Sequence, residues 1–148
     1  SNPDNPTITG SVQDTTNLNG AFGVAVSGNY AYVTANIGDR LTVVDISNPA
    51  APSVVGNVTS TNLDAVTDIA PSGNHAFVIN ASGTAGDRRI TAVNISTPST
   101  PTITGSYNNS ARLAGAYGLT ISGNFAYITG STNDYLSIVN ISNPASMT

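Results

Sequence analysis

The sequence contains no cysteine, no lysine and no glutamate; its eight acidic residues are all Asp and its four basic residues are all Arg. The lack of cysteine excludes disulfide bonds and thiolate metal sites. Lysine and glutamate are charged residues that favour helices, so their absence argues against a helical fold. Charged residues make up only 8% of the chain and the arginines form no basic stripe, which argues against a nucleic-acid partner.

Long apolar runs are also absent from the chain. None approaches the roughly 18 residues that a membrane span needs, so no membrane insertion is expected. Asn, Ser, Thr and Gly supply the polar residues instead of Lys and Glu, a composition associated with secreted and surface proteins. We therefore expect an extracellular or cell-surface protein whose 148 residues can form one domain with a hydrophobic core.

A short pattern that begins with Ser-Gly-Asn and continues into a strand-like run occurs three times, at residues 27–33, 72–78 and 122–128. A second marker keeps the same phase: Asp45-Ile46-Ser47 returns as Asn-Ile-Ser at residues 94–96 and 140–142. A period of about 40–50 residues built from short strands is typical of propeller blades. Such blades cannot bury their faces alone, so the repeats must stack on one another.

Each repeat offers four strand-like segments rich in aromatic and β-branched residues. In the first repeat they cover residues 22–26, 30–34, 41–46 and 53–58, with the Ser-Gly-Asn turn after the first and a Pro-marked turn after the third. The later repeats show the same segments, at residues 67–71, 75–79, 90–95 and 102–107, and at 117–121, 125–129 and 136–141. We predict an all-β fold of β-propeller blades, each a four-stranded antiparallel repeat.

The two ends of the chain are out of phase with these repeats. Residues 1–11 match residues 96–106 almost letter for letter, so the N-terminal strand is predicted to be an outer, fourth strand with no partners before it. The last residues follow a third strand with no fourth strand behind it. We assign residues 1–148 to a single propeller segment, with repeats at approximately 1–46, 47–95 and 96–141 and with 142–148 beginning a further repeat.

Three repeats are fewer than the 4–8 blades of typical propellers, and an unpaired outer strand leaves backbone groups free for another strand. Two outcomes remain open. Either further repeats of the same protein complete a larger propeller, or the N-terminal strand completes the last blade of another copy, giving a homo-oligomeric ring or a filament. The residues expected at this interface are Thr7, Ile8, Thr9, Val12, Leu136, Ile138 and Ile141.

The third strands resemble LVIVD repeats. The segment Leu41-Thr42-Val43-Val44-Asp45 and its equivalents at 90–94 and 136–140 each precede Ile-Ser, and the resemblance covers essentially the whole chain. It implies a β-propeller of bacterial and archaeal surface or secreted proteins, with no enzyme activity and no fixed ligand. Two repeats depart from the family by carrying Asn94 and Asn140 where it favours Asp, but either side chain can accept a hydrogen bond from the following turn.

Two kinds of loop vary among the repeats. The second repeat carries extra residues within 80–88, and the loops at 14–17, 60–64 and 108–112 differ wholly in sequence. Both kinds emerge on the same side of a four-stranded meander. Such variation marks a binding face or reflects neutral drift in solvated loops.

Four charged residues are the candidates for ligand binding: Asp68, Asp87, Arg88 and Arg89. Asp68 stands where the other innermost strands carry glycine, so it either holds a cation or water in the central channel or is a hydrogen-bonded structural residue. Arg88 and Arg89 adjoin Asp87 in the variable loop. They either grip an anion or form a solvated group beside an acid.

Asn80 and Asn108 lie in sequons within the variable loops and are the candidate glycosylation sites. The only histidine, His75, occupies an aromatic position of the repeat, and no cluster of catalytic or metal-ligating residues accompanies it. We expect no enzyme activity, metal or cofactor.

The leading hypothesis is a non-enzymatic structural or adhesive protein. The alternatives are a surface module that binds a ligand, a glycan or a surface protein, and a fragment of a larger enzyme with catalytic residues elsewhere.

Overall fold

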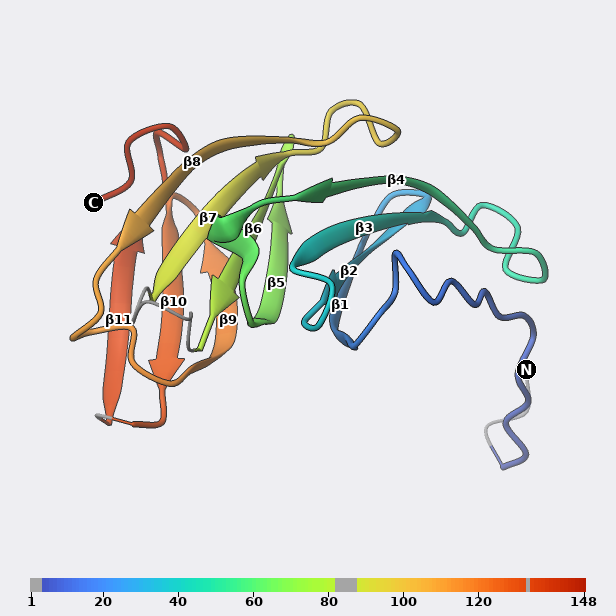
Figure 1. Cartoon of the computed structure of the whole chain (residues 1–148), viewed down its shortest axis with the longest axis horizontal. Helices are drawn as coiled ribbons and strands as arrows, with labels where there is room; N and C mark the ends of the chain where they lie inside the picture. The colour runs from blue at the N-terminus through green and yellow to red at the C-terminus, as the bar shows by residue number, and fades with distance from the viewer. Residues whose placement is uncertain (1–3, 82–87, 133) are drawn as a thin grey trace.

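The computed structural model describes residues 4–81, 88–132 and 134–148 (Figure 1). The strands form three antiparallel sheets that lie one after another along the molecule, and each sheet keeps its strands in sequence order. The first sheet contains β1 (Ala21–Ser27), β2 (Tyr30–Ala35), β3 (Arg40–Asp45) and β4 (Ser53–Thr59). The second contains β5 (Val66–Ser72), β6 (His75–Asn80), β7 (Arg89–Asn94) and β8 (Thr102–Asn108). The third contains β9 (Ala116–Ser122), β10 (Phe125–Gly130) and β11 (Tyr135–Asn140).

The all-β prediction is confirmed, and each predicted strand from residue 22 onward has its counterpart. One short 3-10 helix, η1 (Thr61–Leu63), joins the first sheet to the second. The described residues before β1, 4–20, contain no strand. The outer N-terminal strand, predicted from the match of residues 1–11 to residues 96–106, therefore pairs with no other strand in the described part of the chain.

The Ser-Gly-Asn turns close the first hairpin of every sheet. Gly28, Gly73 and Gly123 each have φ = +57°, a left-handed conformation that favours glycine. Each turn joins the last residue of one strand to the first of the next, as in the pair Ser27 and Tyr30. The local sequence therefore fixes the hairpin register in all three repeats.

The turn that follows each third strand also recurs. Asp45 Oδ1 accepts a hydrogen bond from the Ser47 N–H at 2.8 Å. Asn94 and Asn140 accept the equivalent bonds from Ser96 and Ser142, each at 2.9 Å. The expectation that Asn can replace Asp here is confirmed, because an amide oxygen serves as well as a carboxylate oxygen.

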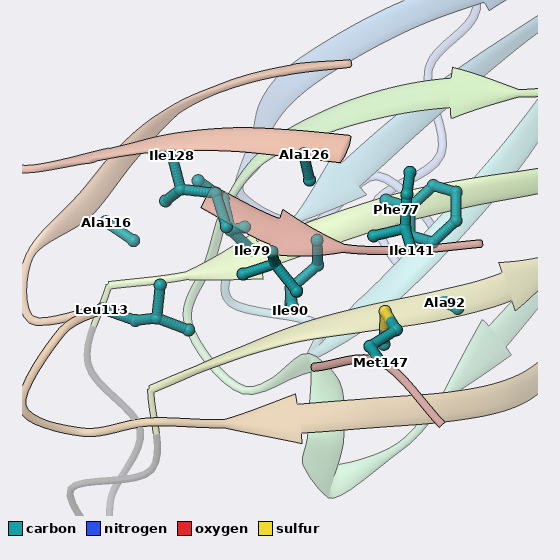
Figure 2. Close-up of a cluster of buried hydrophobic side chains, with 11 residues drawn as sticks. Phe77, Ile79, Ile90, Ala92, Leu113, Ala116, Ala126, Ile128, Ile141 and Met147 are labelled. Atoms are coloured by element: carbon teal, nitrogen blue, oxygen red, sulfur yellow. The ribbon is translucent and has the colours of Figure 1, made fainter. Parts of the chain in front are cut away.

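The sheets bury their apolar residues only by stacking. We call the face of a sheet that meets the following sheet its back face, and the opposite face its front face. Tyr32, Leu41 and Val43 on the back face of the first sheet pack against Val66 and other residues on the front face of the second. Figure 2 shows the second core, where Phe77, Ile79 and Ile90 meet residues of the third sheet. The remaining members of the second core are Ala92, Leu113, Ala116, Ala126, Ile128, Val139, Ile141 and Met147.

The first strand of each sheet lies next to the first strand of its neighbour. A Cβ added to Gly23 of β1 would be 3.0 Å from the Thr67 carbonyl oxygen and 3.2 Å from Asp68 Cα of β5. The Thr67 hydroxyl in turn donates to the Ala116 carbonyl of β9 at 2.8 Å. These contacts hold the three sheets together along their shared inner edge.

Candidate functional site

The back face of the third sheet is open to solvent. Leu136 and Ile138 of β11 are 64% and 58% exposed. The equivalent residues Leu41 and Val43 of β3 are fully buried because the second sheet covers them. Within the described part of the chain, no sheet covers β11 in this way. An apolar face suited to a further sheet is therefore exposed.

The outer edge of β11 is open as well, since no strand among the described residues runs beside it. In the first two sheets the fourth strand places Val58 opposite Leu41 and Tyr107 opposite Ile90. Beside β11 the structure has a cavity of about 230 Å³ instead. Its lining residues are Tyr107, Asn109, Arg112, Leu113, Leu136, Ser137, Ile138 and Val139.

Thr148 pairs with β11 at the position where the fourth strands of the first two sheets begin. Its N–H and carbonyl group bond to the carbonyl group and N–H of Asn140, at 3.1 and 2.6 Å. Asp45 pairs with Ser53 and Asn94 with Thr102 in the same way. Thr148 is therefore already in the register of a fourth strand.

The N-terminal segment lies against the opposite end of the stack. A Cβ added to Gly10 would be 2.3 Å from the Pro49 carbonyl oxygen, in the turn after β3. Gly56 of β4 meets Pro98 and Gly105 of β8 meets Pro144 in the same way, at 2.3 and 2.4 Å. Gly10 thus sits on the first sheet as the fourth-strand glycines sit on the sheets that follow them.

The N-terminal residues that were predicted at the interface are accessible or partly accessible. Thr7, Ile8 and Thr9 are exposed, Ile8 by 89%, and Val12 is half-buried. Within the described part of the chain, the backbone groups of residues 7–13 make no hydrogen bond. The segment therefore rests on the first sheet at Gly10, and its backbone groups remain available to pair with another strand.

Ile141 departs from this pattern. It is only 5% exposed and belongs to the core between the second and third sheets, beside Phe77 and Met147. Its prediction as an interface residue is wrong, because its side chain faces the preceding sheet and not the open end. Leu136 and Ile138 do lie on the open end.

Asp68 is a structural residue of the inner edge. One carboxylate oxygen accepts from its neighbouring Ile69 N–H and the other from the Leu119 N–H of β9, both at 2.8 Å. The carboxylate therefore joins the second sheet to the third. Of the two roles predicted for Asp68, these bonds support the structural one.

The two candidate arginines, Arg88 and Arg89, donate hydrogen bonds to residues of neighbouring loops. The Arg88 guanidinium donates to the Ser110 carbonyl at 3.2 Å, and the Arg89 guanidinium donates to Asn62 Oδ1. Asp87 lies outside the described residues. The described residues bring no group of three His, Asp or similar side chains together that could hold a metal ion.

The loops that precede β1, β5 and β9 make one recurring contact with their sheets, whereas most of the variable loop within 80–88 lies outside the described residues. The hydroxyls of Thr42, Thr91 and Ser137 on the third strands donate to the carbonyls of the loops that precede β1, β5 and β9. The carbonyls belong to Asn17, Asn62 and Arg112. This recurring bond fixes each incoming loop over its own sheet.

The two candidate glycosylation sites, Asn80 and Asn108, differ in solvent exposure. Asn80 is 1% exposed, and its Oδ1 accepts from the Arg89 N–H at 2.7 Å. Its prediction as a glycosylation site in the folded protein is wrong, because β6 extends through residue 80 and buries its side chain. Asn108 is exposed at the end of β8 and stays a candidate.

The family model of the LVIVD repeat matches residues 20–60, 65–109 and 115–148. The chain belongs to the LVIVD repeat family. Each LVIVD repeat corresponds to one sheet, and the assignment predicted from the third strands is confirmed. A comparison with curated proteins found no match.

Sequence reasoning missed two features of the LVIVD repeats that matter at the open ends: the glycine contact of the fourth strands and the pairing of Thr148. Comparing the repeats position by position reveals the recurring Gly10, Gly56 and Gly105, although not what each one touches. A search of the described residues for a helix long and apolar enough to cross a membrane found none.

Proposed function

We propose that this LVIVD-repeat protein is a non-enzymatic, extracellular structural or adhesive segment of a β-propeller that joins further blades through its two open ends. Its blades bury their apolar faces only by stacking, so an end face that stays uncovered costs hydrophobic free energy. The partner is a second copy of the chain or further repeats of the same protein. The Lys-free surface rich in Asn, Ser and Thr supports an extracellular location.

One observation carries the proposal: Gly10 rests on the first sheet as a fourth-strand glycine does, while β11 has an open outer edge. The register of the complete sheets predicts how an N-terminal segment would pair with β11 of another copy. Val12 would lie opposite Leu136 and Gly10 opposite Ile138, as Val58 and Gly56 lie opposite Leu41 and Val43.

The same register limits which N-terminal residues can pair with β11 of another copy. Thr7 would need the position opposite Asn140 that Thr148 already occupies. Strand complementation by a second copy therefore uses residues 8–13 and leaves residue 7 and those before it outside the ladder. Further repeats in the same chain would instead continue the fourth strand from Thr148.

Size-exclusion chromatography with light scattering tests whether copies join one another. We expect a concentration-dependent oligomer that disappears when residues 1–12 are deleted. Leu136→Asp should also abolish it, because a carboxylate on the end face cannot be buried without a partner. Ile37→Asp is the matched control, since Ile37 is 70% exposed in the loop between β2 and β3 and lies on neither end face.

A folded wild-type chain that stays monomeric at high concentration would exclude complementation by a second copy. The remaining possibility is that further repeats of the same protein complete a larger propeller. In that case, repeats added after Thr148 must cover β11. If added repeats leave β11 as exposed as before, the open ends do not join blades and the proposal fails.

A further inference from the structure

The back faces of the first and third sheets carry the same kinds of residue, and that of the second sheet differs. Gly23, Thr34 and Tyr32 of the first sheet correspond to Gly118, Thr129 and Tyr127 of the third. The second sheet has Asp68, Ile79 and Phe77 at these positions. The blades therefore alternate between two kinds.

The two interfaces inside the chain use these positions differently along the inner edge. Between the first and second sheets, Gly23 lets the β5 backbone approach closely, since the Asp68 Cα would be 3.2 Å from a Cβ added to the glycine. Between the second and third sheets, the Asp68 carboxylate reaches the Leu119 N–H beside Gly118. Only the second interface uses the aspartate side chain.

The position of Val66 does show compensation in size. The back face with the smaller Thr34 meets a front face whose first strand carries Val66. The back face with the larger Ile79 meets a front face that carries Ala116, and these two residues share a core. Because protein interiors are close-packed, a small residue on one face calls for a larger one opposite.

We propose that the exposed back face of the third sheet receives an LVIVD blade of the second kind, with a β-branched residue at the position of Val66. The first sheet of another copy fits less well, because it would set Ala21 against Thr129. This position would then pair two small residues and leave space unfilled. The inference rests on the proposed function, since it names the partner of that end face.

Two extended proteins test the proposal. Because Thr148, Thr7 and Ser53 hold the same register, residues 54–108 or residues 8–59 can be added after Thr148 in phase. The first extension completes the third sheet and adds a blade of the second kind. The second extension completes it equally and adds a blade of the first kind, so the two proteins differ mainly in the packing on Leu136 and Ile138.

Hydrogen exchange of the β11 amides, measured by mass spectrometry, reports how firmly each added blade covers the end face. We expect at least about tenfold greater protection with residues 54–108 than with residues 8–59, because the first extension fills the position that Ala21 would leave underfilled. Replacing the alanine that corresponds to Ala21 by valine in the added 8–59 segment should recover part of the difference.

Equal protection by both extensions, or greater protection by residues 8–59, would overturn the inference and leave the proposed function standing. If the unextended chain is monomeric and neither extension protects its β11 further, the end face does not receive blades, and both proposals fail.

Discussion

The Arg112 guanidinium lies over the Tyr135 ring, with its central carbon 4.6 Å from the ring centroid. At the equivalent positions of the first two repeats, Arg40 donates to Asn17 Oδ1 at 2.8 Å and Arg89 donates to Asn62 Oδ1. In the third repeat the arginine lies in the loop and not on the third strand. A cation–π contact there takes the place of the hydrogen bond found in the first two repeats. Both arrangements fasten the incoming loop to its sheet.

The exchange predicts a compensating pair of substitutions. Arg112→Asn alone should lower the free energy of unfolding by about 0.5–1 kcal/mol, the usual size of an exposed cation–π contact. Adding Tyr135→Arg should recover most of the loss by recreating the Arg40–Asn17 bond. Urea unfolding of the two single variants and the double variant measures the coupling. Additive losses would show that the two positions act independently.

Leu41 and Leu136 are equivalent residues with opposite burial, so truncation should separate them. Leu41→Ala removes a fully buried side chain and should cost about 2–5 kcal/mol of stability. Leu136→Ala should change the stability of the unassembled chain by less than about 0.5 kcal/mol, because the side chain is 64% exposed. Chemical denaturation at low protein concentration is the measurement. A large loss for Leu136→Ala would mean that its face is covered in solution.

The fourth-strand glycines should tolerate alanine to different degrees. Gly56→Ala places a Cβ 2.3 Å from the Pro98 carbonyl oxygen within a paired strand, and should cost about 1–3 kcal/mol. Gly10→Ala creates the same clash with Pro49, but the unpaired segment can lift away and little stability is lost. Thermal unfolding compares the two variants, and limited proteolysis of the N-terminal segment reports its release. Equal losses would contradict this explanation.

Asp68 should matter for cohesion between the second and third sheets. Asp68→Ala leaves the Leu119 N–H without its acceptor and should lower stability by about 1–3 kcal/mol. Asp68→Asn keeps one side-chain oxygen and should lose less, which makes it the matched control. A rise in the wild-type unfolding midpoint on adding calcium, lost in both variants, would instead favour the cation role.

The turn after β3 predicts that the stability of the fold depends slightly on pH. Hydrogen bonds from the Ser47 side chain and the Ser47 backbone N–H lower the pKa of Asp45 below its ordinary value of 3.8. Its contribution to stability is therefore present above about pH 4 and is lost as the pH falls through the folded-state pKa. Asp45→Asn should lower the urea midpoint slightly at about pH 7, where the wild-type carboxylate is ionised, and weaken its fall towards about pH 2.5. An equal fall in both proteins would show that this carboxylate is not involved.

The sequence by itself determined the repeats, the hairpins and the family. Ser-Gly-Asn sets a left-handed glycine between two strands, and the Pro-marked turn ends each third strand, so these features depend on neighbouring residues alone. The equivalence of Asp45, Asn94 and Asn140 was predictable for the same reason, since each side chain bonds to the backbone two residues ahead.

Only the tertiary structure decided which equivalent residues are buried, because burial depends on whether another sheet lies opposite. Leu41 is covered and Leu136 is not, although both strands follow one pattern. Ile141 faces inward and Asn80 ends a buried strand, neither of which the sequence predicted. The partners of Asp68 and Arg89 likewise come from segments far along the chain, and only packing of the sheets brings those groups within hydrogen-bond distance.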